Sequence, residues 1–207
     1  MRPSFEICYI TDRQALAPRP LLPFIVEAIQ AGVDLIQIRE KDLATRELLE
    51  LVRSAVEAAR RTATRVVVND RLDVALAAGA AGVHLGGRSL PVAVVRRHVD
   101  RSFLVGASCH SLEEATEAEA GGADYVVLGP IFETPSKLVY GPPLGLEKLR
   151  EVAARVKMPL LALGGVTVER VGACRQAGAA GVAGISIFQN CSSLAARVSE
   201  LRAQFAS

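Results

Sequence analysis

A loop rich in anion-binding groups follows an apolar, strand-like run in the middle of the chain. The run Asp124-Tyr-Val-Val-Leu128 breaks at Gly129-Pro130, and the loop beyond it carries Thr134, Ser136 and Lys137. Two hydroxyls and an ammonium group beyond a buried strand can hold an anion. In an α/β barrel this position, just past a strand, is where the chemistry takes place.

A second polar group ends the run at 34–38. Gln37, Arg39 and Lys41 are spaced by two residues, which puts all three on one side of an extended segment. A solvated strand end is the plain interpretation. Three long polar groups on one face, two of them cationic, favour the binding of a phosphorylated ligand.

Two further strand ends carry groups with more than one interpretation. Asn69-Asp70 follows Val66-Val-Val68 and is either a helix N-cap or a pair of oxygen ligands for Mg²⁺, and the spacing alone favours the cap. His84 precedes a glycine turn at Gly86-Gly87 that lets backbone approach a ligand. His84 itself is expected to be a hydrogen-bonded core histidine and not a catalyst.

The run at 103–107 leads into Ser108, Cys109 and His110. Alternation places Ser108 and His110 on one face and Cys109 on the other. His110 is therefore the acid/base candidate, with a surface histidine before a helix as the alternative. Cys109 is expected only to pack.

The last two strand candidates end in Gly164-Gly165 and in Ile185-Ser186. Barrels hold phosphate at this place with backbone N–H groups and short helix N-termini. Gly-Gly alone is a weak signal, but beside Ser186 it makes a phosphate site a reasonable expectation.

Short runs rich in Val, Ile and Leu predict eight strands, at 6–11, 34–38, 65–68, 82–85, 103–107, 124–128, 159–163 and 181–185. Helical spacing lies between them, as over 45–61, over 111–120 with Ser111 and Glu114 as cap residues, and over 193–204. A glycine recurs at a helix end before each even-numbered strand. Strict alternation predicts a single α/β domain over residues 1–207, a (β/α)8 TIM barrel, with a doubly wound open sheet as the alternative.

Composition limits the kind of partner. Half of the 207 residues are hydrophobic and the formal charge is +2, so there is no general field for nucleic acid or an anionic membrane. The four cysteines lack metal-ligand spacing, and together with the absence of a signal-peptide core or a long apolar run they predict a cytoplasmic protein. The expected partners are small phosphorylated molecules and, as is common for barrels of this size, a second copy in a homo-oligomer.

Taken in chain order, eight motifs at these strand ends resemble the thiamine-phosphate synthase and TenI superfamily, over nearly the whole chain. They are Gln37-Ile-Arg-Glu-Lys41, Asn69-Asp70, Val83-His-Leu-Gly86, Gly106-Ala-Ser-Cys-His110, Gly129-Pro-Ile-Phe-Glu-Thr-Pro-Ser-Lys137, Gly141-Pro-Pro-Leu-Gly145, Gly164-Gly165 and Ile185-Ser186. The resemblance implies a barrel that joins a hydroxymethylpyrimidine diphosphate to a thiazole phosphate and releases pyrophosphate.

The resemblance also implies roles for the candidate residues. Asp70 would ligate Mg²⁺, and Ser108 would contact the pyrimidine or the leaving group. The pyrimidine diphosphate would be bound by Gln37, Arg39, Lys41, Asn69 and Lys137. The thiazole phosphate would be held by Thr134, Ser136, Gly165 and Ser186. Ser108, His110 and Lys137 are the catalytic candidates.

One departure from the synthase pattern concerns the metal. Where synthases usually read Gly-Gln-Glu-Asp after the fourth strand, this chain reads Gly86-Gly-Arg-Ser89, so a hydroxyl replaces the second expected carboxylate. Mg²⁺ binding is thereby put in question. Arg88 is a candidate for offsetting the charge of the leaving group directly.

Two other functions remain open at this point. The run Ser108-Cys-His-Ser-Leu-Glu-Glu-Ala115 is similar to that of the TenI-like thiazole tautomerases, in which His110 would move a proton and no metal is needed. Retention of Lys41 and Asp70 favours the synthase. A non-catalytic sensor of thiazole or thiamine phosphates makes the weakest demand on residues, and a retained ammonium, carboxylate and candidate base argue against it.

Overall fold

Eight parallel strands form a closed barrel in which each strand pairs with the next in sequence and β8 pairs with β1. The computed structural model describes residues 5–134 and 142–206. The strands are β1 (Ile7–Ile10), β2 (Leu35–Ile38), β3 (Arg65–Asn69), β4 (Gly82–Leu85), β5 (Leu104–Cys109), β6 (Tyr125–Leu128), β7 (Leu160–Leu163) and β8 (Gly181–Gly184). This closure confirms the (β/α)8 barrel and excludes the doubly wound sheet.

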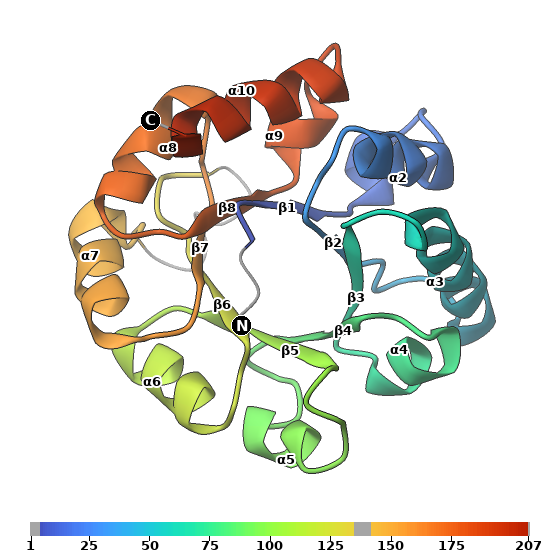
Figure 1. Cartoon of the computed structure of the whole chain (residues 1–207), viewed down its shortest axis with the longest axis horizontal. Coiled ribbons are helices and arrows are strands. Elements are labelled where there is room, and N and C mark those ends of the chain that lie inside the picture. Colours follow the sequence, from blue (N-terminus) through green and yellow to red (C-terminus); the bar gives the residue numbers. More distant parts are fainter. Residues whose placement is uncertain (1–4, 135–141, 207) are drawn as a thin grey trace.

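Helices surround the barrel, as the view along it in Figure 1 shows. They are α1 (Arg13–Leu16), α2 (Leu21–Gln30), α3 (Thr45–Ala59), α4 (Leu72–Ala78), α5 (Val92–Arg96), α6 (Leu112–Ala120), α7 (Gly145–Arg155), α8 (Val168–Gln176), α9 (Ser186–Gln189) and α10 (Leu194–Ala206). The predicted N-cap of α6 is confirmed, since the Ser111 hydroxyl accepts a hydrogen bond from the Glu114 N–H at 3.1 Å. The Glu114 carboxylate does not complete a capping box, because it accepts from the His110 N–H. The helix expected over 45–61 ends at Ala59.

The predicted glycines at helix ends adopt the left-handed conformation. Their φ angles are 86° at Gly32, 67° at Gly79, 91° at Gly122 and 96° at Gly178. A residue with a side chain is strained there, so glycine ends the helix and turns the chain back toward the next strand. Every strand therefore enters the barrel from the same end, and all the strands finish at the opposite mouth.

Two apolar clusters hold the fold together. The larger lies between the strands and the helices, and the smaller fills the barrel and includes Phe5, Leu35, Val67 and Tyr125. Gly106 makes room for Tyr125, because a Cβ on Gly106 would lie 2.1 Å from Cζ of that ring. The barrel interior is thus a packed core, and ligands are restricted to its mouth.

The cysteines behave as packing residues. Cys8, Cys109 and Cys174 are buried, and none of the four is in a disulfide. Burial raises the pKa of the Cys109 thiol to about 12, which leaves it protonated and poorly nucleophilic near neutral pH. No helix in the described part of the chain is both long enough and apolar enough to cross a membrane.

Candidate functional site

A buried amide pair joins the ends of β2 and β3. Gln37 is 2% exposed, and its Nε2 donates to Oδ1 of Asn69 at 3.0 Å. Oε1 of Gln37 is buried and has no hydrogen-bond partner among the described residues. A buried acceptor without a donor costs about 1–3 kcal/mol, so this position favours a ligand that brings an N–H group.

Asp70 has an unusual backbone that fixes its place after β3. Its φ of 65° is the one positive value at a non-glycine residue in the described ranges, and its N–H donates to the His84 carbonyl at 2.8 Å. The cap interpretation of Asn69-Asp70 is wrong, because α4 begins after Arg71 and has no side-chain cap. Asn69 is instead held by Gln37. A strained conformation maintained at a strand end is typical of functional positions.

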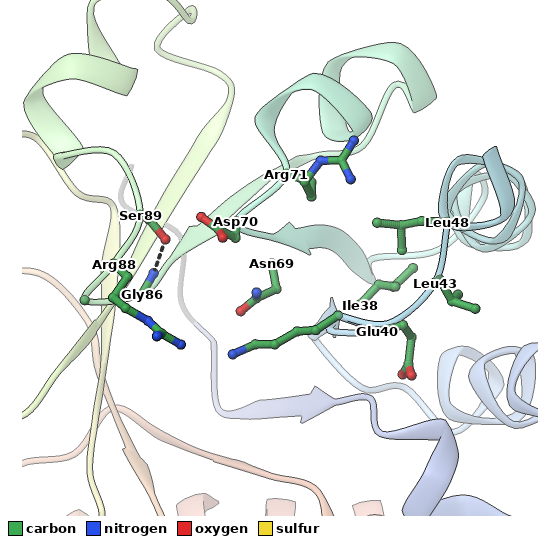
Figure 2. A pocket seen from close by; sticks show the side chains of 12 residues that line it. Ile38, Glu40, Leu43, Leu48, Asn69, Asp70, Arg71, Gly86, Arg88 and Ser89 are labelled. Carbon is green, nitrogen blue, oxygen red and sulfur yellow. Dashed lines mark hydrogen bonds between the residues drawn. The ribbon is translucent and has the colours of Figure 1, made fainter. Parts of the chain in front are cut away.

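A cavity of about 450 Å³ opens at the ends of β2, β3 and β4. Figure 2 shows Asp70 and Arg88 on one side of it and Glu40 turned away from both. Glu40 is committed elsewhere, since it accepts from the Thr11 hydroxyl at 2.6 Å and from the Arg13 N–H. The lining residues are Ile38, Glu40, Lys41, Leu43, Leu48, Asn69, Asp70, Arg71, Gly86, Gly87, Arg88 and Ser89.

The electrostatics of this cavity favour an anion. The pKa of Lys41 is lowered, first by the charge of Arg39, then by desolvation, and also by Arg88, while Asp70 opposes the shift. The lowering reports that positive groups crowd together with too little negative charge nearby. An anionic ligand relieves that repulsion, and a diphosphate carries enough charge to engage several cations at once.

The donor set is poor for a metal held by protein alone. Among the described residues no group of three or more His, Cys, Asp or Glu side chains is placed to hold a metal ion. The Ser89 hydroxyl accepts from the Gly86 N–H at 2.8 Å and so closes its own turn. Mg²⁺ commonly binds through one or two carboxylates together with substrate phosphates, so Asp70 fits a Mg²⁺ ion that arrives with a diphosphate.

Ser108 is connected to the barrel interior through His84. His84 is 1% exposed; its Nε2 lies 2.9 Å from Oγ of Ser108 and its Nδ1 lies 3.1 Å from the Tyr125 hydroxyl. Burial lowers the pKa of His84 to about 4, so the imidazole is neutral near pH 7. The expectation of a hydrogen-bonded core histidine is confirmed, and it serves to hold Ser108.

The donor and acceptor roles in this chain follow from Tyr125. Burial raises the pKa of Tyr125 well above its usual value, so the phenol keeps its proton. Within the described residues His84 Nδ1 is the acceptor in reach of that proton, and a buried O–H without an acceptor is costly. Tyr125 therefore donates to His84, and His84 donates to Ser108 through Nε2–H. The Ser108 proton is left available for a ligand.

His110 lies on the surface at the end of β5. Its Nδ1 is 2.5 Å from the carbonyl oxygen of Gly129, and Glu114 accepts its backbone N–H at 2.6 Å. Because a carbonyl oxygen only accepts, Nδ1 carries a proton in this contact. The neutral ring then has an unprotonated Nε2 that can take up a proton.

The loop after β6 is anchored at both ends by backbone hydrogen bonds. Leu144 N–H donates to the Pro130 carbonyl at 2.8 Å, and Gly145 N–H donates to the Ile131 carbonyl at 3.0 Å. Thr134 lies on this loop and is partly exposed, whereas Ser136 and Lys137 lie outside the described residues.

Gly164-Gly165 and Ile185-Ser186 follow adjacent strands, because Leu163 and Ala183 are register partners. The φ angles of Gly164 and Gly165 are 94° and 62°, and a Cβ on either would collide with the segment 130–133. Ser186 begins the short helix α9. Glycine is thus needed for the backbone to pass this closely under the β6 loop.

Apart from Ser108 and His110 at the end of β5, the predicted residues that the structure describes fall into two groups at one mouth of the barrel. Lys41, Asn69 and Asp70 share the cavity, with Gln37 behind Asn69, while Arg39 lies beside Lys41 outside the cavity lining. Thr134, Gly164, Gly165, Ile185 and Ser186 follow β6, β7 and β8. Sequence reasoning missed Tyr125, because a buried aromatic residue at a strand start has no feature that distinguishes it from core. Arg71 was missed as a lining residue for a similar reason, since it is read as part of a helix start.

Comparisons with known proteins agree with this arrangement. The family model described as thiamine monophosphate synthase matches residues 7–188. A putative thiamine-phosphate synthase of Geobacter sulfurreducens is 44% identical over 183 residues, covering 88% of this chain and 86% of that protein. A thiamine-phosphate synthase of Syntrophomonas wolfei is 37% identical over 199 residues, covering 96% of this chain and 95% of the relative.

A solved structure extends the likeness to three dimensions. The thiamine phosphate pyrophosphorylase of Pyrococcus furiosus has a TM-score of 0.88 and 34% sequence identity, covering 99% of this chain and 97% of its own. The match extends over the whole barrel, including the strand ends that carry the cavity. On these grounds the chain belongs to the thiamine monophosphate synthase family.

Proposed function

We propose that this barrel is a thiamine-phosphate synthase, a transferase that joins hydroxymethylpyrimidine diphosphate to a thiazole phosphate and releases pyrophosphate. The observation that carries the proposal is the cation-lined cavity at the ends of β2, β3 and β4, with the amide pair Gln37–Asn69 beside it. The substrates are those that the resemblance to thiamine-phosphate synthases implies, and the family match supports that choice.

The pyrimidine diphosphate is the ligand that fits this half of the mouth. Lys41 and Arg39 bring positive charge to the diphosphate, and the free Oε1 of Gln37 suits an amino group of the pyrimidine. Asp70 and the diphosphate oxygens would hold Mg²⁺ together. When bound, the ion supplies further positive charge against the leaving group.

The thiazole phosphate is assigned to the other half of the mouth. Gly164, Gly165, Ile185, Ser186 and Thr134 follow β6, β7 and β8, across the barrel from the cavity. Glycine backbone and a serine hydroxyl at neighbouring strand ends suit a phosphate monoester. On the resemblance alone, Ser136 joins the thiazole phosphate site and Lys137 joins the pyrimidine diphosphate site, since both lie outside the described residues.

The reaction needs little covalent work from the protein. The bond between the pyrimidine methylene carbon and the diphosphate oxygen breaks, and its electron pair leaves with pyrophosphate. The thiazole nitrogen then donates its lone pair to the same carbon and becomes a thiazolium. Negative charge grows on the leaving oxygen as the bond breaks, so fixed cations and the Ser108 proton stabilise the transition state more than the ground state.

The test is formation of thiamine phosphate from the two substrates by purified protein, with Mg²⁺ and with EDTA. Lys41→Gln is expected to lower kcat/KM by about 10- to 100-fold, because a charged hydrogen bond to the diphosphate is lost. Lys157→Gln is the matched control, since Lys157 is exposed and precedes β7 at the opposite end of the barrel. Absence of product under all conditions would reject the synthase.

One observation favours a second candidate, a thiazole tautomerase. The bond from His110 Nδ1 to the Gly129 carbonyl leaves Nε2 as a base at the edge of the mouth. In a tautomerase this nitrogen would move a proton on a thiazole carboxylate phosphate. A His110→Asn variant that loses tautomerisation but keeps thiamine phosphate formation would separate the two activities.

The proposal also covers the cellular location and the oligomeric state of the enzyme. Buried, unpaired cysteines support a cytoplasmic location. That the protein forms a homo-oligomer stays a prediction. Light scattering of the purified protein, which measures its mass in solution, checks it.

A further inference from the structure

The turn that follows β4 is built without a metal ligand. Ser89 N–H donates to the Gly86 carbonyl at 2.9 Å, and the Ser89 hydroxyl accepts from the Gly86 N–H at 2.8 Å. These two bonds close the four-residue turn Gly86–Ser89 on itself. The Ser89 oxygen is therefore occupied by the turn, and its side chain brings no negative charge to the cavity.

Arg88 is the residue that this turn presents to the cavity. Figure 2 shows its guanidinium extending away from the turn toward the side of the cavity where Asn69 lies. Within the described residues, Arg88 forms no ion pair with a carboxylate. A charge placed this way, held on a closed turn, is free to contact a ligand.

Arg71 provides a comparison from the same cavity lining. Its Nε and Nη2 bind the two carboxylate oxygens of Asp73 at 2.8 and 2.6 Å, so its charge is neutralised within the protein. Arg88 and Lys41 have no such partner in the described ranges, and Arg88 contributes to the lowered pKa of Lys41. The uncompensated positive charge of the cavity is thus concentrated on Lys41 and Arg88.

We propose that Arg88 binds the diphosphate directly and allows this chain to hold it without Mg²⁺. This inference rests on the proposed function, because it takes a diphosphate as the ligand of the cavity. In the synthase pattern, Mg²⁺ and the second carboxylate together would bring a net charge of about +1 to the site. The guanidinium of Arg88 brings the same charge. A guanidinium in addition binds phosphate oxygens in a bidentate manner.

Calorimetry with inorganic pyrophosphate tests the inference without relying on turnover. Wild-type protein is titrated in EDTA and in excess Mg²⁺, alongside Arg88→Gln and Arg88→Lys. Wild type is expected to bind in EDTA, and Arg88→Gln is expected to weaken that binding by about tenfold or more. Arg88→Lys, which keeps the charge but loses the fork, is expected to lie between the two.

Arg101→Gln is the matched control, because Arg101 is exposed and precedes β5 at the opposite end of the barrel. It removes the same charge and is expected to leave pyrophosphate binding within about twofold of wild type. Ser89→Asp tests the same inference by restoring the carboxylate that the synthase pattern has at this position. The added carboxylate is expected to weaken binding in EDTA and to make Mg²⁺ more effective.

Two results would overturn the inference: wild-type binding that EDTA abolishes, or Arg88→Gln that binds in EDTA as wild type does. Thiamine phosphate formation, measured in parallel, separates this failure from that of the proposed function. Product made with Mg²⁺, together with no pyrophosphate binding in EDTA, would reject the role of Arg88 and leave the synthase standing. Arg88-dependent binding without any product would support the role of Arg88 and reject the synthase.

Discussion

His84 and Ser108 lie 24 residues apart in sequence, and their side chains meet at 2.9 Å inside the barrel mouth. The contact follows from the register of β4 and β5, in which His84 lies opposite Gly106 and Ser108 is two residues further along the same face. Gly106 has no side chain, and the Tyr125 ring fills that space and reaches Nδ1 of His84. A glycine thus allows a tyrosine to set the hydrogen-bonding direction of a serine.

Tyr125→Phe should reduce turnover while the fold stays intact. The change removes the donor to His84 Nδ1 and keeps the ring that packs against Phe5 at 5.6 Å. Without that donor the imidazole can turn its proton to Nδ1, and Ser108 then donates to Nε2 and no longer to the substrate. We expect kcat to fall by roughly tenfold and the free energy of unfolding by about 1 kcal/mol.

A structural role alone would lower stability without a selective loss of kcat. Steady-state kinetics and denaturant unfolding of the same preparations distinguish the two cases. Equal kcat in Tyr125→Phe and wild type would show that the Ser108 proton does not depend on this chain of bonds.

Acid should destabilise the protein through His84. Burial lowers its pKa from 6.5 to about 4, so between these values the unfolded chain binds the proton and the folded chain does not. The free energy of unfolding therefore falls as the pH falls from about 6.5 towards 4, by up to about 3 kcal/mol from this group. Denaturant unfolding at pH 7.0 and 4.5 measures the change.

Glu40 changes the free energy of unfolding in the opposite direction as the pH falls, so its effect has to be distinguished from that of His84. Burial raises its pKa, so protonation of Glu40 favours the folded state as the pH falls. His84→Gln keeps Glu40 and removes the imidazole, and it should flatten the pH dependence relative to wild type. The same slope in both proteins would mean that other groups account for acid instability.

Strand positions were readable from the sequence because a parallel barrel strand is buried on both faces and appears as a short apolar run. The runs predicted at 82–85 and 181–185 match β4 and β8 to within one residue at either end. The alternation that placed Cys109 opposite Ser108 also held, since Cys109 is buried among the helices. These features depend on local pattern alone.

The parts of the site that sequence could not supply depend on contacts between distant segments. Asn69 and Asp70 are residue types that commonly cap helices. The hydrogen bond from the Asp70 N–H to the His84 carbonyl instead holds Asp70 in a left-handed conformation before α4 begins. Glu40 stands between two candidate ligands in sequence, yet Thr11 and Arg13 turn it away. The residues next to Asp70 and Glu40 in the sequence do not indicate either arrangement.

Gly106→Ala should be strongly destabilising. The added Cβ would lie 2.1 Å from Cζ of Tyr125, so the ring must move within a filled barrel. Overpacking of this kind costs about 1–3 kcal/mol, and moving Tyr125 also breaks its bond to His84. Gly87→Ala is the matched control for stability, because a Cβ there meets nothing within 4 Å. Thermal unfolding measures the melting temperature of both variants. Equal melting temperatures would show that the contact between the added Cβ and Tyr125 does not destabilise the fold.

Asp70 combines a charge with an unusual backbone, and two substitutions separate these properties. Asparagine tolerates a φ of 65° at least as well as aspartate, whereas alanine is strained there. Asp70→Asn should therefore keep the stability of wild type and lose the response of pyrophosphate binding to Mg²⁺. Asp70→Ala should lose that response and, in addition, about 1 kcal/mol of stability. If Asp70→Asn kept a full Mg²⁺ response in calorimetry, the carboxylate would not be the ligand, and the ion would depend on the diphosphate alone.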